Sequence, residues 1–382
     1  MNRKKTPLIL CLCLALLLGG CHSDPVGSEP PQGESPSPAP AESAAPPFAS
    51  QGMRVALCTS PGTVDDRGRN SKCYDGVLDF LIARGGMDSV VPLQETTGDP
   101  AVAPSAFLEL AAAYDVMVFV GPAFSQLGSL ARENPNKYFI LVDAPLTGED
   151  GAPIQLDNVC SLEFAEQECG FLAGMAAAME TQTGRVAVIN GETGSSASRY
   201  YYGFRSGVAY ANGNLGTSAE VIDHPGYGGA AEDGSALGGN YTGGSDVTAY
   251  ALANSLMDEG CDILLVAAGA SGVGAVNAVK SRPGTRIIGA ETDQYLNGVN
   301  GTENVMLTSV TKEFANSVTR QLLAITDGTF QSGAVTLRAA DGATGYVSAD
   351  DHQQLKPETL AALADAYPLI QNGTIVPMAG PQ

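Results

Sequence analysis

The sequence of 382 residues is poor in histidine and in basic side chains, and each shortage argues against a class of function. Its three histidines are His22, His224 and His352, which form no HExxH motif, so we expect no catalytic metal site and no cofactor. Only 20 lysine and arginine residues stand against 41 aspartate and glutamate residues. Because phosphate backbones demand a basic surface, this balance argues against nucleic acid and favours a neutral or cationic small ligand.

Long apolar runs are also missing. The apolar stretch at 7–18 stops well short of the roughly 20 residues that a membrane-spanning helix needs. It follows three basic residues and precedes Gly19, Gly20 and Cys21, an order typical of an export signal. We therefore expect residues 1–20 to be a signal peptide.

The run Leu18-Gly19-Gly20-Cys21 resembles the lipobox of bacterial lipoproteins. This resemblance implies that Cys21 is lipidated and becomes the mature N-terminus, anchored on the extracytoplasmic face of the cell membrane. An ordinary signal peptide that happens to contain a cysteine is the alternative. Residues 21–52 are dense in proline, serine and alanine and cannot bury a core, so we interpret them as a tether.

Five cysteines lie beyond the anchor, and their odd number excludes a complete disulfide framework. None of them forms a CxxC pair. We expect buried free thiols, with a Cys58–Cys73 or a Cys160–Cys169 bridge as the alternative.

Short β-rich runs alternate with helical patterns from residue 53 onward, which leaves about 330 residues, enough for two domains. The expected strands are 53–58, 89–93, 115–120, 137–142, 185–189, 219–222, 261–267 and 286–289. The expected helices are 70–83, 106–113, 124–133, 164–179, 199–211, 247–258 and 273–280. Such alternation predicts right-handed crossovers and parallel sheets with helices on both faces. The fold class is α/β, with two doubly wound lobes.

Polar residues follow several of these strands. They are the loop 60–70, Asp143, the glycine-rich run 269–274 and the loop 291–294. In open parallel sheets, ligands bind beyond the carboxyl ends of strands, so we expect the four loops to converge on one cleft. The glycine-rich run reads GxxGxG rather than GxGxxG, which argues against a dinucleotide site. It serves either close helix packing or hydrogen bonding to ligand oxygens.

Several segments resemble the basic membrane protein family, the nucleoside-binding lipoproteins of ABC transporters. The loop Asp65-Asp66-Arg67-Gly68-Arg69-Asn70 is similar to the family's first-strand motif. The run 158–168 followed by 171–174, then Arg199 with Gly203-Phe204, Tyr241-Thr242-Gly243 and 267–274 continue the match in order. The resemblance covers roughly residues 53–330.

The resemblance implies a type I periplasmic-binding-protein fold, with two lobes joined by three crossovers. We expect residues 53–160 and 292–330 in the N-terminal lobe and residues 161–291 and 331–382 in the C-terminal lobe. The implied partners are a nucleoside or related small molecule and an ABC permease. The implied ligand-binding residues are Asp66 and Asn70 on the base, Asp143 in the cleft, Glu291 on the ribose hydroxyls and Lys312, together with Gly269, Ser271 and Asp293. A carboxylate suits this role because it can accept two hydrogen bonds from a vicinal diol.

The chain departs from the family pattern at several positions. Gly68-Arg69 replaces Ser-Phe, Glu291 replaces an aspartate, and Ser245 stands where an aromatic is usual. These changes leave base stacking open and allow a changed ligand. Asp65 could cap the helix near Asn70 while Asp66 faces the ligand, and Asp143 or Asp293 could cap loop amides.

Two other functions compete with transport. A sensory receptor of the same fold would pass a ligand signal to a membrane partner, and the sequence does not separate it from a transport receptor. A nucleoside or sugar hydrolase would need paired carboxylates such as Asp65 and Asp66. Adjacent residues in a strand-like loop point apart, whereas the two acids must flank one bond, so we expect no enzyme.

Overall fold

Six parallel strands build the first of two large sheets in the computed structural model, which describes Phe48 and residues 51–230 and 236–381. Their order across the sheet is β2-β1-β3-β4-β5-β15. The strands are β1 Arg54–Thr59, β2 Ser89–Gln94, β3 Val116–Val120, β4 Tyr138–Val142, β5 Val159–Phe164 and β15 Gly333–Leu337.

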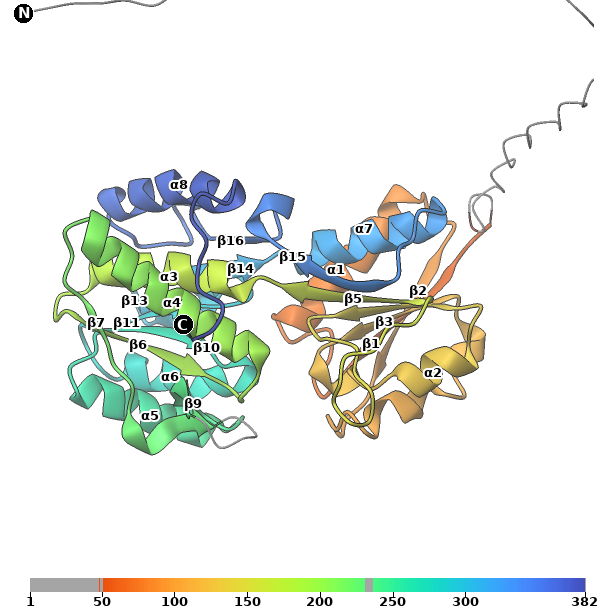
Figure 1. The fold of residues 1–382 in the computed structure, drawn as a ribbon, viewed down its shortest axis with the longest axis horizontal. Coiled ribbons are helices and arrows are strands. Elements are labelled where there is room, and N and C mark those ends of the chain that lie inside the picture. Colours follow the sequence, from red (N-terminus) through yellow and green to blue (C-terminus); the bar gives the residue numbers. More distant parts are fainter. Residues whose placement is uncertain (1–47, 49–50, 231–235, 382) are drawn as a thin grey trace, which may run out of the picture. The chain divides into compact units, whose positions relative to one another are not determined.

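Helices cover both faces of this sheet, so its central strands are apolar along their whole length. Helices α1 (Arg69–Ala83) and α7 (Phe314–Thr326) pack together on one face, and α2 (Gly128–Glu133) lies on the other (Figure 1). Successive strand residues point to opposite faces. Val55 and Leu57 accordingly join the core under α1 and α7, whereas Ala56 and Cys58 join the core on the other side.

The second sheet is larger and mixed. Its order is β16-β14-β11-β10-β6-β9-β8, with β7 also paired to β6. Strands β16 and β8 run antiparallel to their neighbours, and the other pairings are parallel. The strands are β6 Arg185–Asn190, β7 Glu220–Val221, β8 Gly228–Ala230, β9 Ala236–Tyr241, β10 Ile263–Ala267, β11 Arg286–Gly289, β14 Met306–Lys312 and β16 Thr344–Tyr346.

This sheet is also sandwiched between helices. Helices α3 (Glu166–Glu180), α4 (Ser195–Asn214) and α8 (Pro357–Gln371) lie over one face, with α3 packed against the other two (Figure 1). Helices α5 (Asp246–Asp258) and α6 (Gly272–Lys280) pack together on the other face. A separate pair is formed by β12 Val299–Asn300 and β13 Glu303–Asn304. Short 3-10 turns occur at Ala103–Phe107, Ala111–Ala113, Pro122–Phe124, Pro225–Tyr227, Gly269–Ser271, Tyr295–Gly298 and Ala339–Asp341.

The chain passes between the two sheets three times, after β5, after β14 and after β15. We call the first sheet with its helices the first lobe, and the second sheet with its helices the second lobe. The boundaries differ from those expected. Strand β5 stays in the first sheet through Phe164, β14 belongs to the second sheet although it lies within 292–330, and β15 returns to the first sheet after residue 331. Each crossover therefore follows the end of a strand, and the chain continues from that strand into a helix or a 3-10 turn.

Glycines allow α3 and α4 to touch through their backbones. A Cβ atom on Gly174 would lie 2.1 Å from the Phe204 carbonyl oxygen, and one on Gly207 would lie 2.0 Å from the Phe171 carbonyl oxygen. No side chain fits at such distances. The segments 171–174 and 203–204, which carry part of the family resemblance, thus have a packing role in the second lobe.

The expected helix at 106–113 is wrong. The stretch forms two 3-10 turns, held by i to i+3 hydrogen bonds such as Leu110 N to the Phe107 carbonyl oxygen at 3.1 Å. Phe107 and Ala111 reach the core from these tighter turns.

The five cysteines beyond Cys21 are all free and buried, as expected. No helix within the described part of the chain is long and apolar enough to cross a membrane. The expected signal peptide, Cys21 and nearly all of the tether fall outside the described residues.

Candidate functional site

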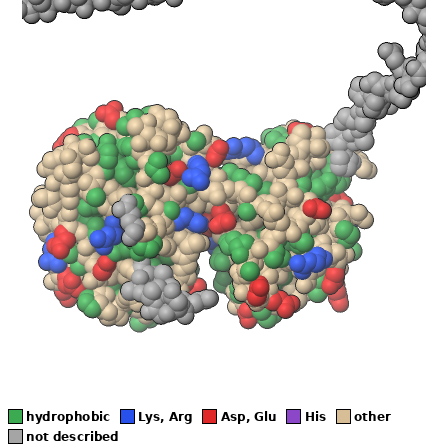
Figure 2. Space-filling view, in the orientation of Figure 1, with side chains coloured by type: hydrophobic (Ala, Val, Ile, Leu, Met, Phe, Trp, Pro, Cys, Tyr) green, Lys and Arg blue, Asp and Glu red, His purple; other side chains and the backbone are tan. Residues whose placement is uncertain are grey.

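Loops from both lobes line a pocket of about 730 Å³. The first lobe contributes residues from the loop that follows β1, including Asp66, Arg69 and Asn70. The second lobe contributes residues around the ends of β10 and β11, including Gly269 and Glu291. The molecular surface is hollowed between the lobes in Figure 2. Strand ends of both sheets thus meet at one pocket, as the sequence predicts for three of the four loops.

Asp66 is the residue that caps helix α1. Its carboxylate accepts hydrogen bonds from the backbone N–H groups of Gly68 at 2.8 Å, Asn70 at 3.1 Å and Ser71 at 3.0 Å. The capping role considered for Asp65 therefore falls to Asp66. Asp66 also lines the pocket, but its oxygens are already shared among three donors. A carboxylate engaged in this way is poorly suited to serve as a catalytic acid or base.

Asn70 lies at the start of α1 and is only 5% exposed. Its Oδ1 is buried and has no hydrogen-bond partner among the described residues. Buried polar groups normally find a partner, so an unpartnered amide that lines a pocket points to an external ligand.

Arg69 crosses the pocket wall to Asp143, the residue after β4. Its Nη1 donates to Asp143 Oδ2 at 2.8 Å. The guanidinium lies against Gly121, whose φ is +96° and where a Cβ atom would be 2.6 Å from Arg69 Nη2. Nε of Arg69 is buried and has no partner in the described chain.

Lys312 is the centre of a buried ionic cluster. It is the last residue of β14, two residues before the start of α7, and its side chain is 0% exposed. Its Nζ lies 2.7 Å from Asp143 Oδ1, 2.9 Å from Glu166 Oε1 and 3.5 Å from Glu291 Oε1. The rings of Phe164, Tyr200 and Phe314 surround the ammonium group at 5.5 to 5.8 Å.

Charge pairing outweighs burial in this cluster. Burial alone would lower the pKa of Lys312, but Asp143 and the other carboxylates raise it well above its ordinary value. Burial alone would raise the pKa of Asp143, but Lys312 and Arg69 hold that pKa below its ordinary value. Asp143 and Lys312 are therefore ionised together, and their pair joins the two lobes. Neither residue is among those that line the pocket, although both were expected as ligand-binding residues.

Glu291 is the carboxylate of the cluster that remains accessible. Its side chain is 25% exposed and lines the pocket. Glu291 and Asp143 both adopt left-handed backbone conformations, with φ of +71° and +63°. Non-glycine residues in this region are uncommon, and they occur often at functional sites.

Asp293 and Ser271 do not join the pocket. Asp293 pairs with Nδ1 of His352 and accepts from the backbone N–H of Tyr295 at 2.9 Å. The Asp293 carboxylate raises the pKa of His352. The Ser271 hydroxyl donates to the Ala268 carbonyl oxygen at 2.7 Å and lies 2.9 Å from the Thr242 hydroxyl. Of the glycine-rich run, Gly269 lines the pocket and Ser271 is buried beside it.

Two further residues with unpartnered polar atoms were not anticipated as site residues. Asn190 is fully buried at the end of β6, and neither its Nδ2 nor its Oδ1 has a partner among the described residues. The Tyr200 hydroxyl is also buried and unpartnered there, and its ring faces Lys312 at 5.6 Å. The sequence held one signal for Asn190, because it is a polar residue at the carboxyl end of an expected parallel strand. Tyr200 lay within a tyrosine run that reads as packing.

Arg199 links the first crossover to α4. Its Nε donates to Glu166 Oε2 at 2.5 Å, and its Nη2 lies 3.5 Å from Glu163 Oε2. Glu166 is therefore shared between Arg199 and Lys312. Figure 2 shows acidic and basic side chains side by side at the waist between the lobes.

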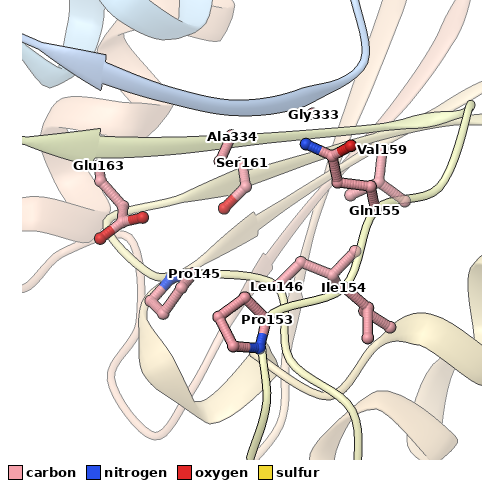
Figure 3. A pocket seen from close by; sticks show the side chains of 10 residues that line it. All are labelled: Pro145, Leu146, Pro153, Ile154, Gln155, Val159, Ser161, Glu163, Gly333 and Ala334. Carbon is pink, nitrogen blue, oxygen red and sulfur yellow. The ribbon is translucent and has the colours of Figure 1, made fainter.

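A second pocket of about 480 Å³ is formed by the first lobe alone. Figure 3 shows Pro145, Leu146, Pro153 and Ile154 facing Ser161 and Ala334 across it. The Ser161 hydroxyl already donates to the Ala144 carbonyl oxygen at 2.6 Å, and Glu163 pairs with Arg199. Its polar groups are thus largely engaged. Across the described residues, no group of three or more histidine, cysteine, aspartate or glutamate side chains is arranged to hold a metal ion.

Two lobes, three crossovers and a pocket at the strand ends define a solute-binding protein fold. Solved structures agree with this architecture. An ABC transporter solute-binding protein from Aeropyrum pernix matches with a TM-score of 0.66 and 21% identity, covering 86% of this chain and 94% of that one. A solute-binding protein from Conexibacter woesei matches with a TM-score of 0.62 and 18% identity, covering 86% and 100%.

The chain belongs to the Bmp family, described as PnrA-like ABC transporter substrate-binding proteins, whose model matches residues 53–226 and 244–376. Basic membrane protein A of Borreliella burgdorferi is 27% identical over 304 residues, which span 75% of this chain and 77% of the relative. The CD4+ T-cell-stimulating antigen of Listeria innocua is 24% identical over 393 aligned residues, or 98% of each chain. Membership implies a small-molecule ligand and a permease partner, in a family of binding proteins rather than enzymes.

Proposed function

We propose that this protein is the nucleoside receptor of an ABC importer. The observation that carries the proposal is the pocket in which an unpartnered Asn70 amide and the accessible Glu291 carboxylate occur together. An amide suits the hydrogen-bonding edge of a base, and a carboxylate suits the vicinal hydroxyls of ribose. The pocket volume of about 730 Å³ lies within the range of roughly 300–1,000 Å³ for small-molecule sites.

The charges of the pocket do not call for a phosphate group. Asp66 and Glu291 line it together with Arg67 and Lys280, and the positive charges of Arg69 and Lys312 are already paired with Asp143. The two carboxylates would repel a phosphate group, so we expect the nucleoside to bind more tightly than its nucleotide. Binding would proceed by closure of the lobes about the three crossovers, without covalent chemistry.

Titration calorimetry with adenosine, guanosine, inosine and uridine tests this proposal. We expect heat with at least one nucleoside and at least tenfold weaker binding of its 5′-monophosphate. Glu291→Gln should weaken a nucleoside more than its 2′,3′-dideoxy analogue, because only the former has the diol. Glu303→Gln, in β13, serves as the matched control. Absence of heat with every nucleoside would overturn the nucleoside assignment.

The membrane anchor is part of the proposal. Lipid on Cys21 would hold the receptor near its permease, with residues 21–52 as tether, since each buried methylene contributes about 0.8 kcal/mol. Cys21→Ser should release the protein from membranes and leave nucleoside affinity unchanged. Fractionation and calorimetry measure the two effects, and a variant that stays in the membrane fraction would contradict the lipid anchor.

A further inference from the structure

The guanidinium of Arg69 is only partly used by the protein. Nη1 donates to Asp143, while neither Nε nor Nη2 donates to any residue that the structure describes. Nε–H and Nη2–H point along the same side of the planar group and form a two-donor edge. Gly121 leaves space for the guanidinium against its backbone, so packing and the Asp143 ion pair together fix its position.

The next residue offers complementary chemistry. Asn70 is more than nine-tenths buried, and its Oδ1 is unpartnered in the described chain. Both residues line the same pocket. The pocket wall therefore carries two N–H donors of Arg69 and, beside them, the Asn70 carbonyl oxygen as an acceptor. None of these groups has a hydrogen-bond partner among the described residues.

Two parallel donors require two neighbouring acceptors. A carboxylate offers them, but Asp143 already neutralises the charge of Arg69. The remaining charged residues that line the pocket balance, Asp66 and Glu291 against Arg67 and Lys280, so the pocket gives an anion no preference over a neutral ligand. A neutral ring with the same feature is a 6-oxopurine, whose O6 and N7 form the edge that arginine contacts most often. Its N1–H is then available to Asn70 Oδ1. Adenine instead has an amino group at position 6, which would place N–H against N–H.

We propose that Arg69 is a specificity-determining residue that selects 6-oxopurine nucleosides, such as guanosine and inosine, over adenosine. This inference rests on the proposed nucleoside-binding function and adds the class of base. Asn70 supports the selection as the acceptor for the ring N–H.

Titration calorimetry on the full chain tests the inference with guanosine, inosine, adenosine and 7-deazaguanosine. We expect guanosine and inosine to bind about 10- to 100-fold more tightly than adenosine. Loss of N7 in 7-deazaguanosine should remove much of that advantage. Arg69→Lys keeps a cation for Asp143 but lacks the planar two-donor edge, so the preference should fall to within about threefold. Arg54→Lys, at an exposed ion pair with Asp115, should leave it intact.

The possible results separate the two proposals. Nucleoside binding with equal affinity for adenosine and guanosine would overturn this inference and leave the receptor function standing. A preference that survives Arg69→Lys would overturn the role of Arg69. No binding of any nucleoside would overturn both. If Arg69→Lys fails to fold, as judged by thermal melting, the comparison of guanosine with 7-deazaguanosine on the unmodified chain still decides.

Discussion

Two polar groups meet at the interlobe pocket and differ in how completely the protein satisfies them. Lys312 is fully buried, and three carboxylates lie within 3.5 Å of its ammonium group. Arg69 and Asn70, unlike Lys312, line the pocket itself, and they carry an unpartnered donor and an unpartnered acceptor. The first group is complete without a ligand, whereas the second is not. This contrast separates the residues that hold the lobes together from the residues whose free hydrogen-bonding groups are available to a ligand.

Asp143 couples the two groups. One of its oxygens accepts from Lys312 and the other accepts from Arg69. The structural cluster thus fixes the guanidinium that faces the pocket. A substitution in the cluster should therefore affect stability first and binding as a consequence, whereas a substitution at Asn70 should affect binding alone.

The largest effect is expected for Lys312→Met. Removing the cation leaves Asp143, Glu166 and Glu291 close together without their shared partner. Breaking a buried ion pair in this way costs about 3–5 kcal/mol of unfolding free energy. Urea unfolding followed by circular dichroism measures the loss.

The exposed pair Lys72–Asp75 provides the matched control. Lys72→Met should change the unfolding free energy by less than about 1 kcal/mol, because surface ion pairs contribute little. A loss of less than about 1 kcal/mol for Lys312→Met as well would show that the buried cluster is not a structural bond between the lobes.

An intermediate effect is expected for Asp143→Asn, and it should depend on pH. The variant loses a charged acceptor for two cations, at a cost of about 2–3 kcal/mol at neutral pH. The pKa of Asp143 is lower in the folded protein than in the unfolded chain, where it is about 3.9. Its stabilisation is therefore complete above that value and is lost as the pH falls through the folded-state pKa.

Unfolding curves at pH 7 and at steps below pH 4 check this dependence. The difference between the unmodified protein and Asp143→Asn should shrink as the solution becomes more acidic than about pH 4. A difference that stays constant to the lowest pH would mean that ionisation of Asp143 is not what stabilises the fold.

Apolar periodicity was sufficient to predict the framework up to residue 289 apart from β5, β8 and β9, but it did not predict the strands beyond that residue. Each expected strand from 53–58 to 286–289 corresponds to an observed one, because buried parallel strands are nearly continuous apolar runs. Strand β14 was not predicted from an apolar run, because two polar residues, Thr308 and Ser309, interrupt it in the core. Their hydroxyls are satisfied, with Thr308 donating to the Val347 carbonyl oxygen and Ser309 accepting from the Gln294 backbone N–H.

The sequence was sufficient to predict which loops carry polar residues at strand ends, but not which side chains of those loops contact one another. Polar residues after β1, β4, β10 and β11 could be assigned to strand ends, where parallel sheets place their ligands. The pairing of Lys312 with Asp143 joins residues 169 positions apart, which no local pattern reveals. Asp66 and Asp293 turn back to nearby backbone N–H groups instead, because a short carboxylate side chain reaches such donors readily.

The smallest effect on stability, and the sharpest test of the comparison, is expected for Asn70→Leu. Leucine has nearly the shape of asparagine and removes an unpartnered buried amide, so the unfolding free energy should change by less than about 1 kcal/mol or increase. Binding of guanosine should nevertheless fall at least tenfold, since the acceptor is gone.

Asn158→Leu in the same lobe is the matched control, because Asn158 Nδ2 donates to the carbonyl oxygens of Ala131, Asn134 and Lys137. It should lose about 2–3 kcal/mol of stability and keep its affinity. If Asn70→Leu were as destabilising as Asn158→Leu while binding stayed intact, Asn70 would be a structural residue and the contrast at the pocket would not hold.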